Sequence, residues 1–216
     1  MKLLVKKLSV PAVHAERIPE LLQAAGVQYH GVDHVNWHED FPYHPVMTFG
    51  MAHTDDAILI HYRVEEDCIR AVAPHDNGHV WEDSCCELFL SPVDDGSYYN
   101  MECNCAGTLL VGYGNDRNGR VLAPQDVLDH VDRWTTLGRS PFESREGHCQ
   151  WEMALAIPYT TFFKHDIKTM DGVVARGNVY KCGDQTAQPH FLSWNPIDLP
   201  KPDFHCPAFF GEMVFE

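Results

Sequence analysis

The sequence has 216 residues, of which 44% are hydrophobic, and this is enough to form a globular domain with a substantial core. Its 31 Asp and Glu against 16 Lys and Arg give a formal net charge of −15, and no run is rich in basic residues. Nucleic acids and anionic membrane surfaces would repel such a chain, so we exclude both as partners. Apolar and aromatic residues are spread along the whole length, which excludes a disordered chain.

The start of the sequence does not show the pattern of a signal peptide. The apolar run after Lys2 is short and is followed by Lys6 and Lys7, and no small-residue cleavage site comes after them. No apolar stretch reaches the roughly 20 residues that cross a bilayer. The 8 cysteines include no Cys-x-x-Cys pair, so neither a zinc ribbon nor a thioredoxin-type motif is present. We expect a cytoplasmic protein with reduced, mostly buried thiols.

The first predicted element is a helix over residues 13–25, with Ile18, Leu21 and Leu22 on one face and Gly26 as its stop. Strands 45–52 and 57–64 follow, joined by a polar turn, and alternation in the second strand predicts a β-hairpin. Two short helical pieces are expected at 124–134 and 159–163. The remaining predicted strands are 84–90, 98–105, 108–113, 150–157, 173–181, 190–194 and 209–215.

Short strands separated by turn residues, with few helices, predict an all-β fold. We expect a β-sandwich, immunoglobulin-like or jelly-roll-like, with short accessory helices. Without an internal repeat or a Ser/Gly-rich linker, residues 1–216 are interpreted as a single domain in which 1–44 form a helix-containing lead-in.

Alternation within three strands gives the first indication of function. Strands 84–90, 98–105 and 173–182 each have one apolar side, and the other side carries amides, carboxylates, an arginine and aromatic rings, including Glu87, Asn100, Glu102, Asn104 and Arg176. A solvated sheet face more often shows Lys, Thr and Ser. The polar side therefore suits a surface that binds polyols, although a solvated face is the competing interpretation.

Several motifs on these strands resemble those of the family 9 carbohydrate-binding modules. The matching runs are residues 80–90 (VWEDSCCELFL), 98–108 (YYNMECNCAGT), 151–158 (WEMALAIP), 175–184 (ARGNVYKCGD), 190–196 (HFLSWNP), 203–205 (DFH) and 209–212 (FFGE). They occur in the family's order from about Pro45 to Glu216, and the sequence is most similar to the free-standing members from glycan-degrading gut bacteria.

The resemblance implies a β-sandwich that binds the end of a β-glucan, xylan or related chain without cleaving it. It implies that the sugar lies between two tryptophans, for which Trp81 and Trp194 are the candidates. The polar candidates for the sugar hydroxyls are Asp83, Glu87, Asn104, Arg176 and Asn178. A few hydrogen bonds plus stacking would give affinities in roughly the micromolar to millimolar range. The family also implies a poly- or oligosaccharide partner, a partner glycoside hydrolase and a structural calcium ion.

Each of these residues also has a purely structural interpretation. A tryptophan on a sandwich strand is more often part of the core than a binding platform. Asp83 and Glu87 lie on the same side of their strand and could serve to orient Arg176 in a buried ion-pair network.

Metal binding would be a different function for the same chain. His30, His34 and His38 are four residues apart, but Gly31 and Val32 favour a loop or strand there, so adventitious Zn or Ni affinity is the better interpretation. Calcium could be bound by the turns at 94–96 and 115–119, neither of which matches the EF-hand pattern.

Catalysis and haem binding are two more functions that a β-sandwich of this kind could serve. A glycosidase would pair Asp83 or Glu87 with Glu102, but the sequence holds no nucleophile elbow, phosphate loop or Cys-His dyad. Haem binding would need a Met or His pair across a pocket, which Met101 and the 14 histidines permit without specifying.

Overall fold

The computed structural model describes residues 1–216 and shows a β-sandwich, as the sequence predicted. The strands are β1 (Lys2–Lys7), β2 (His30–Gly31), β3 (His34–Val35), β4 (Val46–His53), β5 (Ala57–Ala71), β6 (Cys85–Ser91), β7 (Tyr98–Asn104), β8 (Leu109–Gly114), β9 (Val121–Leu122), β10 (Asp132–Thr135), β11 (Phe142–Pro158), β12 (Val174–Cys182), β13 (Phe191–Ser193) and β14 (Gly211–Phe215). The helices are α1 (Ile18–Ala24) and α2 (Gln125–Asp129), with 3-10 turns η1 (Ala15–Arg17), η2 (Val80–Glu82), η3 (Tyr159–Thr161) and η4 (Pro207–Phe209). None of the helices is long and apolar enough to span a bilayer.

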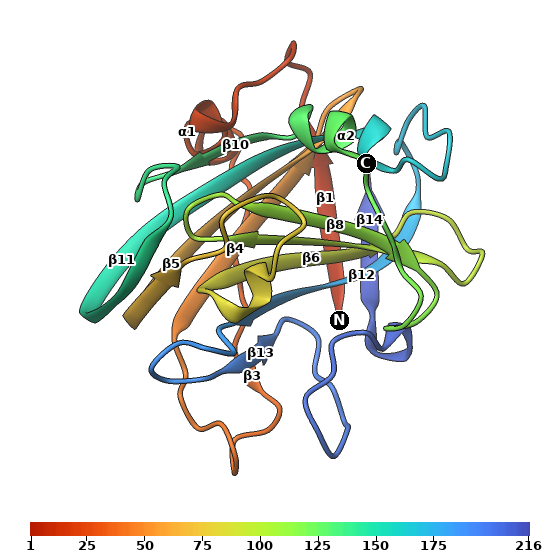
Figure 1. Cartoon of the computed structure of the whole chain (residues 1–216). Helices are drawn as coiled ribbons and strands as arrows, with labels where there is room; N and C mark the ends of the chain where they lie inside the picture. The colour runs from red at the N-terminus through yellow and green to blue at the C-terminus, as the bar shows by residue number, and fades with distance from the viewer.

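Two sheets form the layers of the sandwich. The first sheet has the order β14-β12-β6-β7-β8-β9, with β13 and β3 added beside β12, and the second has the order β4-β5-β11-β10, with β2 beside β4. Strands β4, β5 and β11 run together at an angle to β6, β8 and β12 (Figure 1). The predicted hairpin is present as β4 and β5, and β5 continues to Ala71 because the long β11 pairs along it.

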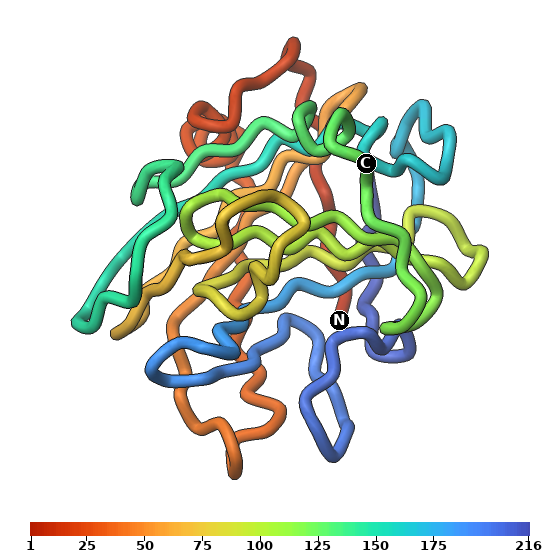
Figure 2. Tube along the Cα trace, viewed as in Figure 1, coloured from red at the N-terminus to blue at the C-terminus, as the bar shows by residue number.

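Strand β1 joins the two sheets and was not predicted, since its apolar run is short. Its first part pairs in parallel with β14, from Lys2↔Glu212 to Val5↔Phe215, and its end pairs with β4 at Lys6↔Ala52. The first and last strands of the chain therefore lie side by side (Figure 2).

The two helical predictions inside 1–44 and 124–134 were only partly right. The first helix is the single element α1 after one 3-10 turn, and its Ile18 and Leu22 pack on the outer face of the second sheet. The second ends at Asp129, and residues 132–135 form the edge strand β10 instead. The backbone of β11 offers hydrogen-bond partners there, which outweighs the helical pattern of the sequence.

The core lies between the sheets, and the predicted alternation of the first sheet is confirmed. Cys86, Leu88 and Leu90 of β6 belong to the core, and so do Tyr99, Met101 and Cys103 of β7. The alternate residues of both strands point to the outer face. A second apolar cluster on that face, which includes Phe89, Tyr98, Tyr180 and Phe204, surrounds the polar side chains described next.

Candidate functional site

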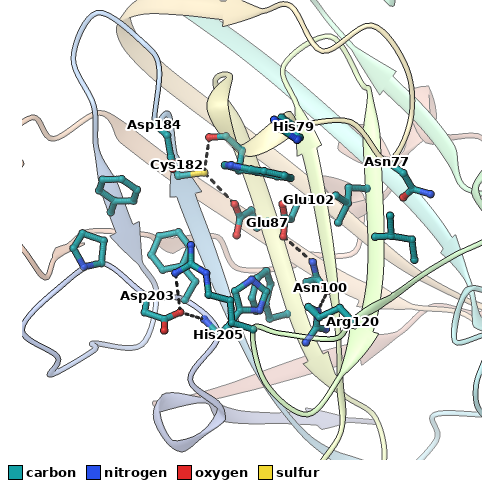
Figure 3. A pocket seen from close by; sticks show the side chains of 18 residues that line it. Asn77, His79, Glu87, Asn100, Glu102, Arg120, Cys182, Asp184, Asp203 and His205 are labelled. Carbon is teal, nitrogen blue, oxygen red and sulfur yellow. Dashed lines mark hydrogen bonds and ion pairs between the residues drawn. The ribbon is translucent and has the colours of Figure 1, made fainter.

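A cavity of about 400 Å³ lies on the outer face of the first sheet, and its size is within the range typical of small-ligand sites. Its floor comes from β12, β6, β7 and β8, and its walls come from η2 and from the loops before β9 and β14. Figure 3 shows its polar side chains, with His79 at one end, His205 and Arg120 at the other, and Glu87 and Glu102 between them. Its lining residues are Asn77, His79, Trp81, Glu87, Phe89, Asn100, Glu102, Leu110, Arg117, Arg120, Leu122, Cys182, Asp184, Phe191, Pro202, Asp203, Phe204 and His205.

Two carboxyl groups form the centre of the floor. Glu87 of β6 is directly opposite Glu102 of β7, and their side chains are only 2% and 4% exposed. Glu87 Oε1 accepts a hydrogen bond from the Cys182 thiol at 3.0 Å, and Glu102 Oε1 accepts one from Asn100 Nδ2 at 2.7 Å. No lysine, arginine or histidine forms an ion pair with either carboxyl group. The floor thus has carboxyl oxygen atoms with unused hydrogen-bonding capacity and no ion-pair partner.

Burial changes the ionisation of both carboxyl groups. Burial, together with the nearby Glu102, raises the pKa of Glu87 well above its usual range. Burial raises the pKa of Glu102 to about 7. The pair therefore retains proton near neutral pH, and it can both donate and accept hydrogen bonds.

Trp81 borders the cavity at the His79 end. The His79 ring stacks on its indole at a centroid distance of 4.6 Å, which covers one face. The backbone fixes the position of η2, because the Trp81 carbonyl accepts a hydrogen bond from the Asp184 amide at 3.2 Å. Since Trp81 lines the cavity, its uncovered face offers a flat apolar surface to a ligand.

His205 and Arg120 form the opposite end. A 2.9 Å hydrogen bond joins His205 Nδ1 to the Tyr98 hydroxyl, and burial, aided by the Arg120 charge, lowers the pKa of His205 to about 4. His205 is therefore neutral at physiological pH. Arg120 donates from Nε to Asn100 Oδ1 at 2.8 Å and from Nη2 to the Tyr98 carbonyl at 3.0 Å. A chain of hydrogen bonds thus runs from Arg120 through Asn100 to Glu102.

The glycine at position 112 makes room for this chain. Gly112 is paired with Asn100 across β7 and β8, and a Cβ atom there would be 2.5 Å from Asn100 Oδ1. A larger residue would push the Asn100 amide away from both Arg120 and Glu102.

Comparison with known proteins identifies the family of the chain. Residues 16–215 match the model described as carbohydrate-binding family 9. The chain belongs to carbohydrate-binding family 9. A crystal structure from Bacteroides uniformis, provisionally described as a carbohydrate-binding protein, is 50% identical with a TM-score of 0.97, and the match covers 100% of this chain and 99% of the other. A comparison with curated proteins gave no match.

More distant solved structures share the fold of this family 9 protein. Two are family 9 modules from Caldicellulosiruptor kristjanssonii, one in complex with cellotriose and one with glucose. Each is 12% identical to this chain, with TM-scores of 0.60 and 0.57. The matches cover 100% of this chain and 94% and 96% of the modules, respectively.

Of the seven residues predicted to bind sugar in this family 9 protein, the structure brings Trp81 and Glu87 together in the cavity. Trp194 is not there. It is 1% exposed in the core, where its ring packs edge-on against Phe49 and closely against Gly211. The aromatic wall is formed instead by Phe191 of β13 and by Phe204 and His205 of the loop before β14.

Asp83 and Asn104 also lie outside the cavity, fully buried at the end of the β6–β7 pair. Asp83 accepts hydrogen bonds from Arg70 Nη1 at 2.8 Å, from the amides of Val72 and Ala73 at 3.0 Å, and from Asn104 Nδ2 at 2.8 Å. All the acceptor capacity of the Asp83 carboxylate is used. Asp83 and Asn104 therefore connect the end of β5 to the first sheet. The partner of Asp83 is Arg70, not Arg176.

Arg176 and Asn178 donate hydrogen bonds to the backbone of the segment between β13 and β14. Arg176 Nη2 donates to the Phe210 carbonyl at 2.7 Å, and its side chain is exposed. Asn178 Nδ2 donates to the Asn195 carbonyl at 2.9 Å, and its Oδ1 accepts from the Asn195 amide at 2.8 Å. Neither reaches the cavity.

The functional residues that the sequence reasoning missed come mainly from loops. Alternation placed Asn100 and Glu102 on the polar face that suits polyols, and Glu102 was also considered as a catalytic carboxylate, but neither was selected as a sugar-binding candidate. His205 stood within the family-like motif at 203–205. No signal in the sequence indicated that Arg120, which follows an exposed loop, would turn back over β7.

In both turns considered for calcium, an aspartate oxygen accepts a hydrogen bond from a backbone amide of the same turn. Asp95 accepts from the Ser97 amide and hydroxyl and contacts His165, and these bonds lower the pKa of its carboxyl to about 2. His30 and His34 lie on the short strands β2 and β3 rather than on a helix.

Proposed function

We propose that this cavity binds the end of a β-glucan, xylan-type or related sugar chain without cleaving it. The observation that carries the proposal is the combination, in one cavity, of the uncovered face of Trp81 with a buried floor of carboxyl and amide groups. The cavity is bounded at both ends, by Trp81 with His79 and by His205 with Arg120, so it suits a terminal sugar better than the middle of a chain (Figure 3).

The chemistry of a pyranose fits these surfaces. Its axial C–H groups are slightly positive and pack on the negative face of an indole, while its equatorial hydroxyls point outward in the ring plane. Glu87, Glu102 and Asn100 can donate to or accept from such hydroxyls, and neutral His205 could contribute a ring nitrogen. Water displaced from the floor is replaced by hydroxyl groups that can make the same hydrogen bonds.

Two further facts support a glucan as the ligand. The chain belongs to carbohydrate-binding family 9, and the structurally similar family 9 modules were solved with cellotriose and glucose. A glycoside hydrolase that acts on the same polysaccharide is the partner that we propose for a module of this kind.

Isothermal titration calorimetry with glucose, cellotriose and xylotriose tests the proposal. We expect dissociation constants of about 1 µM to 1 mM for at least one of these ligands, and about 10-fold or greater weakening by Trp81→Ala. Cellotriose reduced to its alditol tests whether the reducing end is recognised. Lack of binding to every oligosaccharide, or binding that Trp81→Ala leaves unchanged, would refute the proposal.

The carboxyl pair makes a matched test for catalysis necessary. Glu87 and Glu102 are the two acidic residues of the floor, and a glycosidase would need one of them ionised. Because burial raises the pKa of both, we expect binding without hydrolysis. Release of reducing ends from cellotriose by wild type but not by Glu102→Gln would instead assign an enzyme.

A further inference from the structure

One compact set of metal-ligating side chains lies at the edge of the cavity floor. Cys85 of β6 and Cys182 of β12 are directly opposite each other in the antiparallel register, and Glu87 follows Cys85 on the same face of β6. A sulfur or oxygen atom of each lies within 4.8 Å of the others, and all three side chains are buried. The backbone of two paired strands therefore holds two sulfurs and one oxygen together.

This set has the donor composition of a site for a thiophilic cation. Sulfur ligands favour Zn²⁺ and similar ions over Ca²⁺ and Mg²⁺, and a tetrahedral Zn²⁺ ion takes sulfur at about 2.3 Å and oxygen at about 2.0–2.2 Å. Ligand atoms around such an ion are roughly 3.5–4 Å apart, which lies between the 3.0 Å that separates Glu87 from Cys182 and the 4.8 Å that bounds the whole set. The Glu87 carboxyl accepts a hydrogen bond from the Cys182 thiol at 3.0 Å, and neither group forms an ion pair with a positively charged side chain.

Metal binding at this set requires its ligands to lose their protons. Burial raises the pKa of both thiols and of Glu87, so all three hold their protons when nothing positive is near. A divalent cation would displace these protons and supply the missing positive charge. Other buried cysteines, such as Cys86 and Cys103, belong to the core between the sheets and point away from the site.

The site is open on one side. Glu87 and Cys182 line the cavity, and Asp184, two residues beyond Cys182, lines it as well (Figure 3). A fourth ligand can therefore come from Asp184, from water or from a ligand hydroxyl in the cavity, as in metal sites that keep an exchangeable position.

We propose that Cys85, Cys182 and Glu87 bind one thiophilic divalent cation of the Zn²⁺ class at the edge of the cavity floor. Sugar recognition does not require this ion. The ion would enter through the cavity, and its open position would face the bound ligand.

Titration of the reduced protein with Co²⁺, in the absence of oxygen, tests the site directly. We expect one equivalent to bind with a thiolate-to-cobalt charge-transfer band and tetrahedral ligand-field bands, and we expect Zn²⁺ to displace it. Cys85→Ser and Cys182→Ser should each lose the charge-transfer intensity. Cys149→Ser and Cys206→Ser, which change partly exposed cysteines elsewhere, should retain it.

A second measurement needs no variant. Zn²⁺ should protect Cys85 and Cys182, but not Cys149 or Cys206, from alkylation as mapped by mass spectrometry. Absence of stoichiometric binding, an unchanged spectrum in both serine variants, or a Cys85–Cys182 disulfide in the native protein would overturn the inference. Calorimetry of chelator-treated protein with sugar separates the two proposals, because loss of metal binding alone leaves sugar affinity intact, and loss of sugar binding alone leaves the cobalt spectrum intact.

Discussion

Two groups of buried polar side chains lie on or beside the strand pair β6 and β7, namely Asp83 with Asn104 and Glu87 with Glu102. The first group pairs an acid with an amide and the second pairs two acids, and both groups are almost completely buried. Asp83 receives four hydrogen bonds, including one from Arg70, whereas Glu87 receives one from a thiol and Glu102 one from an amide. The first group is complete in itself, and the second has capacity left for a ligand.

The two groups differ in how many of their hydrogen-bonding positions are occupied within the protein. That number, and not residue type or burial, separates a structural polar cluster from a binding site. A complete network stabilises the fold, because removal of one member leaves the others buried without partners. An incomplete network costs stability in the free protein, and the missing partners define what the site can bind.

The largest effect is expected from a matched pair of isosteric substitutions. Asp83→Asn removes the charge opposite Arg70 and replaces one acceptor by a donor that faces other donors. We expect it to lower the free energy of unfolding by about 3–5 kcal/mol. Glu87→Gln should change it by less than about 1 kcal/mol at pH 7, because Glu87 is already protonated there. Urea denaturation of both variants measures this, and equal losses would contradict the distinction.

The two tryptophans extend the same contrast from polar groups to aromatic ones. Trp194→Ala empties a large volume in the core and should lower the free energy of unfolding by about 3–5 kcal/mol. Trp81→Ala should cost about 1 kcal/mol or less, since Trp81 is only partly buried, and should act on sugar affinity instead. Thermal melts and calorimetry on the same preparations separate the two effects. If Trp194→Ala remains fully stable but loses binding, Trp194 acts in recognition and our placement of it in the core fails.

Local patterns predicted the fold well because they are direct consequences of the strand period. Alternation in β6 and β7 assigned the hydrophobic residues of both strands to the correct faces, and the turn residues delimited most strands. β1 and β10 escaped prediction because their strand conformation depends on partners far away in the sequence, β14 and β11. No local window contains that information.

The site was predictable only in part for a similar reason. Motif similarity selected Trp81 and Glu87, which line the cavity. It also selected four residues that stabilise the fold instead, namely Asp83, Asn104, Asn178 and Trp194. Whether an acid or amide is already satisfied depends on distant residues: Arg70 for Asp83, and the Asn195 backbone for Asn178. Arg120 reaches the floor through a loop whose conformation has no sequence period.

An intermediate effect is expected when a change of pH ionises Glu102 and lowers the free energy of unfolding. The pKa of Glu102 is raised from its usual 4.5 to about 7 in the folded protein. Between these values the unfolded chain releases the proton and the folded protein keeps it. Glu102 therefore contributes its full stability below pH 4.5, and this contribution is lost as the pH rises to about 7, up to about 3 kcal/mol in all.

Denaturant titrations from pH 4.5 to 8 on wild type and Glu102→Gln measure this contribution. Glutamine keeps the acceptor for Asn100 but cannot ionise, so the decline should be shallower in the variant. Glu143→Gln, which changes an exposed glutamate, should follow wild type. Parallel curves for wild type and Glu102→Gln would mean that Glu102 ionises normally and that the floor already contains a counter-charge.

The smallest effect concerns two neighbouring tyrosines on opposite faces of β7. Tyr98 is hydrogen-bonded to Nδ1 of His205 at 2.9 Å on the cavity side, and Tyr99 to Nδ1 of His165 at 2.8 Å on the other. Tyr98→Phe and Tyr99→Phe should each cost about 1 kcal/mol of stability. Only Tyr98→Phe frees a histidine that borders the cavity, so it alone should weaken sugar binding, by roughly 2- to 5-fold. If both variants bind sugar as tightly as wild type, His205 takes no part in recognition and that end of the cavity is only a steric boundary.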